Sequence, residues 1–201
     1  MIIEKKANTT EPINKIIAKR WSTRAFNSEK KITRQKILAI CEAAHWAPSC
    51  SNDQPWRFLI FNKNEDAESW QKAFELLSVW NQRWVKNVPV LIIAFADDKF
   101  RKEGEPNRWG QFDTGAACMN IYLQAVSMGL MAHPMGGFDL EKVKFVFSIP
   151  DNFTPMAFIA VGCQADADIL EGKYKKNELD ERTRFPLGDS FFDSAWGKPI
   201  K

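Results

Sequence analysis

The run from Pro89 to Ala96, PVLIIAFA, restricts the fold of this chain more than any other stretch of its sequence. It is a continuous apolar segment of strand length, and a strand without polar alternation is typical of a sheet that is covered on both faces. A second apolar run, from Met156 to Val161, is closed by Gly162 and has the same character. The sequence therefore predicts strands that are buried on both sides.

Helical patterns and loops account for most of the remaining chain. Thr33 is a predicted N-cap, and Asp139 is expected to cap a later helix in the same way. Behind Thr33, apolar residues repeat at helical spacing at Ile37, Leu38, Cys41, Ala44 and Ala47. The other predicted elements are a short helix opening at Glu11-Pro12, a strand over Trp56–Phe61, a helix from about Glu65 through Trp84, a loop over Asp97–Gly110, an apolar helix over Phe112–Met128 ended by Gly129, and a polar, irregular stretch after Gly162.

Size and composition indicate one globular domain. The chain has 201 residues, of which 45% are hydrophobic and 26% charged, so a substantial core is expected. We treat residues 1–201 as a single domain, with 1–11 as a short N-terminal extension and 163–201 as a C-terminal tail. A net charge of +3 is too small to indicate a nucleic-acid partner. No apolar segment has the length of a signal peptide or a membrane span, so a cytoplasmic location is expected.

Cysteine and histidine usage argues against a metal site and against nucleophilic catalysis. Cysteines stand at 41, 50, 118 and 163 without metal-type spacing, and the chain has only two histidines. Unpaired thiols suit a reducing compartment. Cys118 lies in the apolar helix, where a thiol is usually inert. Ser49 and Cys50 could use His45, but no third group orients it, so no catalytic side chain and no metal are predicted.

Small polar residues gather in APSCSNDQPW, from Ala47 to Trp56, between a helical pattern and a strand. Turn-forming residues on rigid supports are a common place for binding groups, although an ordinary helix-to-strand connection has the same composition. Near the start of the chain, RWSTR places Arg20 and Arg24 around Ser22, a set that could bind one anion or simply end a helix in solvent.

Further groups of the same kind occur later in the chain. Arg182 and Arg184 form a second basic pair. Asn52, Gln54 and Asn81 could hydrogen-bond a flat heterocycle together with the glycine-rich segment from Pro134 to Gly137. Paired glycines permit positive φ and close approach to a ligand. Anion-binding and amide-binding groups together suit a planar, phosphorylated cofactor. No GxGxxG or GxxxxGK[ST] motif indicates a Rossmann or P-loop site.

The order RWSTR, APSCSNDQPW, NQRWVKNVPVLIIAF, HPMGGFD and RTRFPL resembles the nitroreductase family of flavin-dependent oxidoreductases. The resemblance runs from about Pro12 to Leu187, nearly the whole chain. It implies an α+β fold, a three-layer α/β/α sandwich with a central, mainly antiparallel sheet. It also implies an intertwined homodimer with FMN at the interface, which the many tryptophans and phenylalanines would suit.

The resemblance also implies which residues meet the flavin. The first motif would hold the phosphate and the pyrimidine side, with Arg24 near the N1–C2=O edge, where it would stabilise reduced FMN. The APSCSNDQPW loop would reach the flavin of the other subunit, and the tail would close on the phosphate. The implied cofactor contacts are Arg20, Trp21, Ser22, Arg24, Pro48, Ser49, Cys50, Asn52, Gln54, Asn81, Pro134, Met135, Gly136, Gly137, Arg182 and Arg184.

The implied activity is hydride transfer from NADH or NADPH through flavin N5 to a nitroaromatic, quinone or flavin acceptor, with donor and acceptor using one site in turn. Two departures stand out: Cys50 replaces a second serine of many members, and Trp84 replaces a lysine of some. Two other hypotheses stay open. One is a specialised FMN enzyme for a particular metabolite, with the Asp97–Gly110 loop shaping its pocket. The other is a flavin-binding sensor without turnover.

Overall fold

A buried antiparallel sheet forms the centre of the computed structural model, which describes residues 2–200. Within those residues the sheet has four strands in the order β1-β2-β4-β3, and each neighbouring pair is antiparallel. The strands are β1 (Trp56–Asn62), β2 (Val90–Asp97), β3 (Met131–Met135) and β4 (Phe153–Gly162). The two apolar runs of the sequence are therefore β2 and β4, which pair with each other in the middle of the sheet.

Strand β2 is buried along its whole length, as its composition predicts. Its side chains alternate between two cores: Leu91 and Ile93 belong to one hydrophobic cluster, and Val90 and Ile92 belong to the other. Full burial of one such side chain contributes about 1.5–3 kcal/mol. Because both faces of β2 are covered, the sheet must lie between two helical layers.

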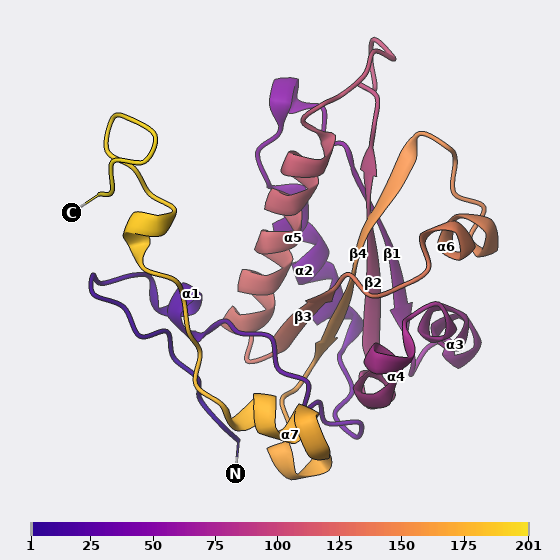
Figure 1. Ribbon diagram of the computed structural model, residues 1–201. Coiled ribbons are helices and arrows are strands. Elements are labelled where there is room, and N and C mark those ends of the chain that lie inside the picture. Colours follow the sequence, from indigo (N-terminus) through magenta and orange to yellow (C-terminus); the bar gives the residue numbers. More distant parts are fainter. Residues whose placement is uncertain (1, 201) are drawn as a thin grey trace.

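Those layers lie on opposite sides of the sheet (Figure 1). One contains α2 (Arg34–His45) and α5 (Gly110–Ser127), and the other contains α3 (Ala67–Glu75), α4 (Val79–Val85) and α6 (Leu140–Val146). The predicted three-layer α+β sandwich is confirmed. Thr33 and Asp139 cap α2 and α6 with their side chains, also as predicted. The remaining helical segments are α1 (Lys15–Lys19), η1 (Cys50–Asn52), η2 (Ala167–Ile169), α7 (Gly172–Leu179) and η3 (Leu187–Asp189).

The predicted single helix from Glu65 to Trp84 is wrong, because the chain forms two helices there. After α3 the backbone leaves the helix, and Leu77 makes an isolated bridge with Phe138. Ser78 then donates its backbone N–H to the Gly137 carbonyl at 2.9 Å and caps α4 with its side chain. The aromatic residues keep their helical spacing across this break, which is why the sequence pattern predicts one helix.

Three smaller predictions also need correction. The first helix begins at Lys15, capped by Asn14, and not at Glu11-Pro12. Leu38 lies on the exposed side of α2, and Ile40 is buried in its stead. The stretch after Gly162 is not irregular throughout, because it forms α7, whose one buried residue is a glutamate.

Candidate functional site

Three arginines from distant parts of the sequence line one cavity of about 450 Å³. Arg20 follows α1 with extended backbone (φ −64°, ψ 124°), which directs the chain away from the helix axis. Arg182 and Arg184 come from the tail beyond α7. The Arg20 Nη1 donates to Ser22 Oγ at 3.5 Å. The cavity is completed by Ala7, Asn8, Thr9, Ile13, Ile17, Met119, Leu123 and Thr183, so its walls are mostly apolar or uncharged.

No acidic residue compensates these charges within residues 2–200, where none of the three guanidiniums forms an ion pair with a carboxylate. Partial burial and the neighbouring Arg184 lower the pKa of Arg20. Burial, followed by Arg20 and Arg184, lowers the pKa of Arg182. Arg182 instead donates to the carbonyls of Lys5 (2.7 Å) and Ala18 (3.0 Å), which ties the N-terminal segment to the tail. Arg20 and Arg182 are half-buried, and they lie beside the exposed Arg184 without a counter-charge, an arrangement that fits a phosphate group.

The rest of RWSTR lies against β3. The Thr23 carbonyl is 2.8 Å from His133 Nδ1, and a carbonyl can only accept, so the imidazole donates from Nδ1. The pKa of His133 is lowered to about 4, chiefly by burial and also by the nearby Arg24 and Arg20, while the hydrogen bond to Thr23 opposes the shift. The Arg24 guanidinium is half-buried and has no hydrogen bond or ion pair within residues 2–200. It is thus available to a ligand.

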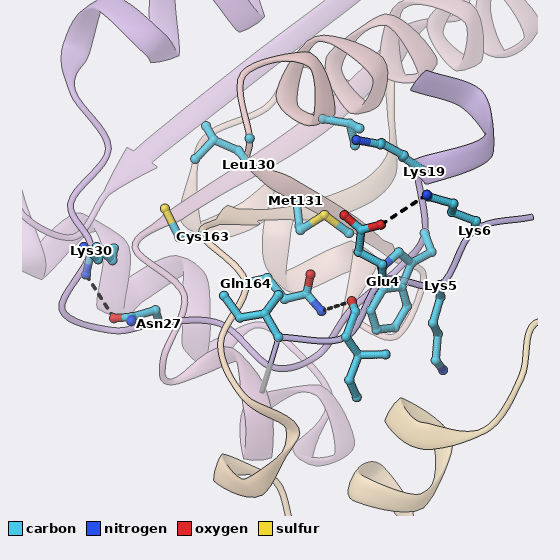
Figure 2. A pocket seen from close by; sticks show the side chains of 15 residues that line it. Glu4, Lys5, Lys6, Lys19, Asn27, Lys30, Leu130, Met131, Cys163 and Gln164 are labelled. Atoms are coloured by element: carbon cyan, nitrogen blue, oxygen red, sulfur yellow. Dashed lines mark hydrogen bonds and ion pairs between the residues drawn. The ribbon is translucent and has the colours of Figure 1, made fainter. Parts of the chain in front are cut away.

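The Trp21 side chain belongs to the hydrophobic core and does not line the arginine-lined cavity. It is 6% exposed and lies under Lys5 Nζ, 4.7 Å from the ring centre. It lines a separate cavity of about 370 Å³ between the N-terminal segment and the end of α5 (Figure 2). Gln164 and the Glu4–Lys6 pair lie at that cavity. A contact between the Trp21 ring and a ligand in the arginine-lined cavity has no support in this arrangement.

Asn81 and the glycine segment meet directly. The Asn81 Nδ2 donates to the Gly137 carbonyl at 3.0 Å. A Cβ at Gly137 would lie 2.9 Å from Ser78 Oγ and 3.0 Å from Asn81 Nδ2, whereas a Cβ at Gly136 would meet nothing within 4 Å. Paired glycines permit a positive φ, but neither Gly136 nor Gly137 adopts one. Close packing against α4 is what requires glycine at 137.

The same segment is less turn-like than predicted. Pro134 and Met135 are the last residues of β3, and Met135 is buried in the core. Only the two glycines that follow leave the sheet. The backbone of this strand end, rather than the Met135 side chain, is therefore what the segment can present to a ligand.

The loop between α2 and β1 has an unusual backbone. Ser51, Asn52 and Gln54 have φ of 53°, 56° and 52°, a left-handed region that costs non-glycine residues energy. Hydrogen bonds hold the loop in place: Cys50 N–H donates to Asp113 Oδ2 at 2.9 Å, and Gln54 N–H donates to Ser49 Oγ at 3.0 Å. Strain of this kind persists only where the surroundings enforce it, and it clusters at functional sites.

In one chain this loop and the arginine-lined cavity are separate. Figure 1 shows the loop, with its short η1 turn, near the start of α5, whereas α1 and the tail lie nearer its other end. No hydrogen bond within the described part of the chain joins Pro48–Gln54 to Arg20, Arg182 or Arg184. The predicted residues thus form two groups: RWSTR, α4, the end of β3 and the tail on one side, and the strained loop on the other.

The structure adds two residues to the first group that sequence analysis did not select. His133 bonds the RWSTR backbone, as described above, and Glu178 of α7 bonds it from another direction. His133 is the first residue of the HPMGGFD motif, so the sequence carried a signal for it. No local pattern marks Glu178, because its partners are more than 150 positions away. Trp84, at the expected lysine position, is buried, and its Nε1 has no partner in the described residues.

Known proteins are similar to this chain in fold and sequence. A crystal structure described as an oxidoreductase containing FMN is 35% identical and has a TM-score of 0.90, with 98% of this chain and 100% of that chain covered. A 15.4 kDa protein of Mycolicibacterium smegmatis is 35% identical over 113 residues, 55% of this chain and 73% of that protein. The oxygen-insensitive NAD(P)H nitroreductase of Enterobacter cloacae is 24% identical over 212 residues, covering 86% and 94%.

The fold and these relatives define an α+β enzyme of the oxidoreductase class. The sequence pattern of the nitroreductase family matches residues 17–163, which include RWSTR, the strained loop, α4 and β3. The chain belongs to the nitroreductase family. The match ends before Arg182 and Arg184, so the place of the tail in the site rests on the geometry of the arginine-lined cavity.

Proposed function

We propose that this protein is an FMN-dependent NAD(P)H oxidoreductase that works as a homodimer. The observation that carries the proposal is the cavity lined by Arg20, Arg182 and Arg184 without an acidic partner in the described residues. A planar cofactor with a phosphate supplies the missing negative charge. Held there, FMN would supply hydride transfer at N5 between NADH or NADPH and a nitroaromatic, quinone or flavin acceptor.

The residues of the chain hold and orient that cofactor. Arg20 and Arg184 bind the phosphate, while Arg182 fixes the N-terminal segment beside them. Ser22 donates to the same end, and the unpaired Arg24 guanidinium supplies positive charge at the N1–C2=O edge, where negative charge develops on reduction. Asn81 acts by holding the Gly137 carbonyl at 3.0 Å, which fixes the glycine backbone beside the ring. No side chain of the protein need act as nucleophile.

A second copy of the chain completes the site. The strained residues Asn52 and Gln54 lie away from the arginine-lined cavity of their own chain, so they can contact a flavin only across an interface. The helical layer that flanks them exposes large apolar side chains, including Trp46 (77%) and Phe112 (74%). Apolar surface of this extent on neighbouring helices is typical of a protein contact. We treat residues 1–201 as one domain, with the tail 163–201 shared between cofactor site and dimer.

A specialised enzyme of the same fold is the second candidate, and one observation favours it. The Asp97–Gly110 loop is built onto the strained loop: Arg101 N–H donates to Asp53 Oδ1 at 2.9 Å, and Asn107 Nδ2 to Asp53 Oδ2 at 3.3 Å. A loop joined to the cofactor site in this way would shape the space for a particular acceptor.

No described helix is long and apolar enough to cross a membrane.

Flavin uptake and reduction test the proposal. Flavin-free protein should quench the fluorescence of added FMN with one FMN per chain at saturation, and anaerobic NADH or NADPH should then bleach the bound flavin. A protein that takes up no FMN overturns the proposal. A protein that binds FMN but leaves it oxidised with both donors is a sensor instead. Comparing nitroaromatic, quinone and flavin acceptors afterwards separates the general enzyme from the specialised one.

A further inference from the structure

A buried carboxylate lies against the backbone of RWSTR. Glu178, near the end of α7, is 1% exposed. Its Oε2 accepts from the Arg24 backbone N–H at 2.9 Å. Its Oε1 accepts from the Ala25 N–H at 3.3 Å and from the Thr23 hydroxyl in a short hydrogen bond. Three donors satisfy the carboxylate, which would otherwise be costly to bury.

The opposite side of the same peptide is held by an imidazole. His133 is 7% exposed, and its Nδ1 lies 2.8 Å from the Thr23 carbonyl. Its ring packs on Trp84, with 4.6 Å between ring centres and a tilt of 36°, which limits its rotation. Thr23 is therefore bonded through its carbonyl by β3 and through its hydroxyl by α7. The peptide between Ser22 and Arg24 has little freedom to rotate.

Neither contact follows from the needs of the fold alone. Glu178 is the only buried residue of α7, and a carboxylate near the C-terminal end of a helix meets the unfavourable end of the helix dipole. An apolar residue would dock α7 at lower cost. Glu178 also lies shortly before Arg182 in the sequence. Its side chain therefore links the RWSTR backbone to the tail that carries the phosphate-binding arginines.

We propose that Glu178 and His133 are positioning residues that hold the Thr23 peptide so that Arg24 and Ser22 face the flavin. This inference rests on the proposed function. Neither residue contacts the cofactor in this scheme: Glu178 acts through the Arg24 and Ala25 amides, and His133 acts through the Thr23 carbonyl. Together they set the relative position of the charge at the N1–C2=O edge and the charges at the phosphate.

Glu178→Gln tests the carboxylate in the full-length protein. Glutamine keeps the size but has one acceptor oxygen, and its NH₂ would face a backbone N–H. We expect FMN affinity to fall at least about tenfold, as for loss of one charge-assisted hydrogen bond. The midpoint potential of the bound flavin should become more negative, because a loosened Arg24 stabilises reduced FMN less. Glu171→Gln is the matched control, because Glu171 is an exposed glutamate at the N-cap of the same helix, and it should change neither quantity.

Amide hydrogen exchange of the flavin-free protein probes the contacts between Glu178 and the RWSTR backbone without the cofactor. Exchange at Arg24 and Ala25 should accelerate in Glu178→Gln and not in Glu171→Gln. Faster exchange with unchanged FMN affinity and potential would overturn the positioning role. If Glu178→Gln does not fold, Thr23→Val keeps the buried shape, removes only the hydroxyl and should show the same changes to a smaller degree. A wild-type protein that binds no FMN would refute the proposed function, while the exchange result would still test the two contacts.

His133 is tested by a rescue pair. Asparagine places an N–H donor close to the position of Nδ1, whereas leucine has none, and both remove the ring from Trp84. His133→Asn should keep both the wild-type midpoint potential and the wild-type slow exchange of the neighbouring amides, and His133→Leu should lose both. Equal effects of the two substitutions would show that His133 acts only by packing, which would overturn its part of the inference.

Discussion

Arg20→Ala should separate recognition of FMN from recognition of riboflavin, which has the same ring system but no phosphate. Arg20 lines the cavity with Arg182 and Arg184 and lacks a carboxylate partner in the described residues. A charge-assisted hydrogen bond contributes about 1.5–3 kcal/mol. At about 1.4 kcal/mol per factor of ten, FMN should bind the variant roughly 10- to 150-fold more weakly. Riboflavin affinity should not change, because the lost contact is to the phosphate.

The same substitution should act differently on the flavin-free protein. Burial and Arg184 both lower the pKa of Arg20, which means that its charged form is disfavoured when no anion is present. Removing this charge should leave the thermal midpoint of the flavin-free protein unchanged or slightly raised. The rise in thermal midpoint that saturating FMN produces should become smaller, since stabilisation by a ligand falls as its affinity falls.

Fluorescence titrations with FMN and riboflavin on flavin-free protein measure the effect. Arg34→Ala is the matched control, because Arg34 begins α2, and its side chain is 64% exposed. Equal weakening of FMN and riboflavin by Arg20→Ala would show that Arg20 does not recognise the phosphate. Unchanged FMN affinity would refute the reasoning from uncompensated charge altogether.

Three further predictions follow from the other parts of the site. The double substitution Asn52→Ala, Gln54→Ala should weaken FMN binding but leave the circular dichroism spectrum intact; full flavin occupancy would return the loop to a structural role. Gly137→Ala should destabilise the protein by about 1–3 kcal/mol in urea unfolding, because its Cβ would overlap the α4 side chains, whereas Gly136→Ala should be neutral. The pKa of His133 is lowered by burial from 6.5 to about 4, so the unfolded state takes up the proton first as the pH falls. Stability should therefore be full above about pH 6.5 and decline by about 3 kcal/mol towards pH 4, with a smaller decline in His133→Asn; equal declines would contradict the assignment.

The sheet and its covering helices could be predicted because their signals are local. An apolar run such as Val90–Ala96 cannot be stable in water on either face, so its composition alone requires two helical layers. Thr33 and Asp139 also act locally, since each side chain accepts from an N–H three residues ahead. Such features depend on a few neighbouring residues and on nothing distant.

The errors occur where distant contacts override local periodicity. The break between α3 and α4 exists because Ser78 and Leu77 bond the segment around Gly137, some sixty positions later. Nothing in the aromatic spacing from Trp70 to Trp84 records that contact. The helix α7 was missed for a related reason: its buried residue is polar, and it makes sense only with the RWSTR backbone beside it.

The candidate site shows the same division between local and distant information. Residue types identified Arg20, Arg182 and Arg184 as possible anion ligands, but arginines that merely face solvent look the same in a sequence. What distinguishes them is that folding brings them to one cavity with mostly apolar or uncharged walls, and that no carboxylate among residues 2–200 pairs with them there. A chain would gain stability from an acidic residue there, so the missing counter-charge is best explained by a ligand that carries it. A sequence does not record which charges lack a partner in space. The uncompensated charge is also the reason why Arg20→Ala should weaken FMN binding through the phosphate, while riboflavin affinity and the fold stay unchanged.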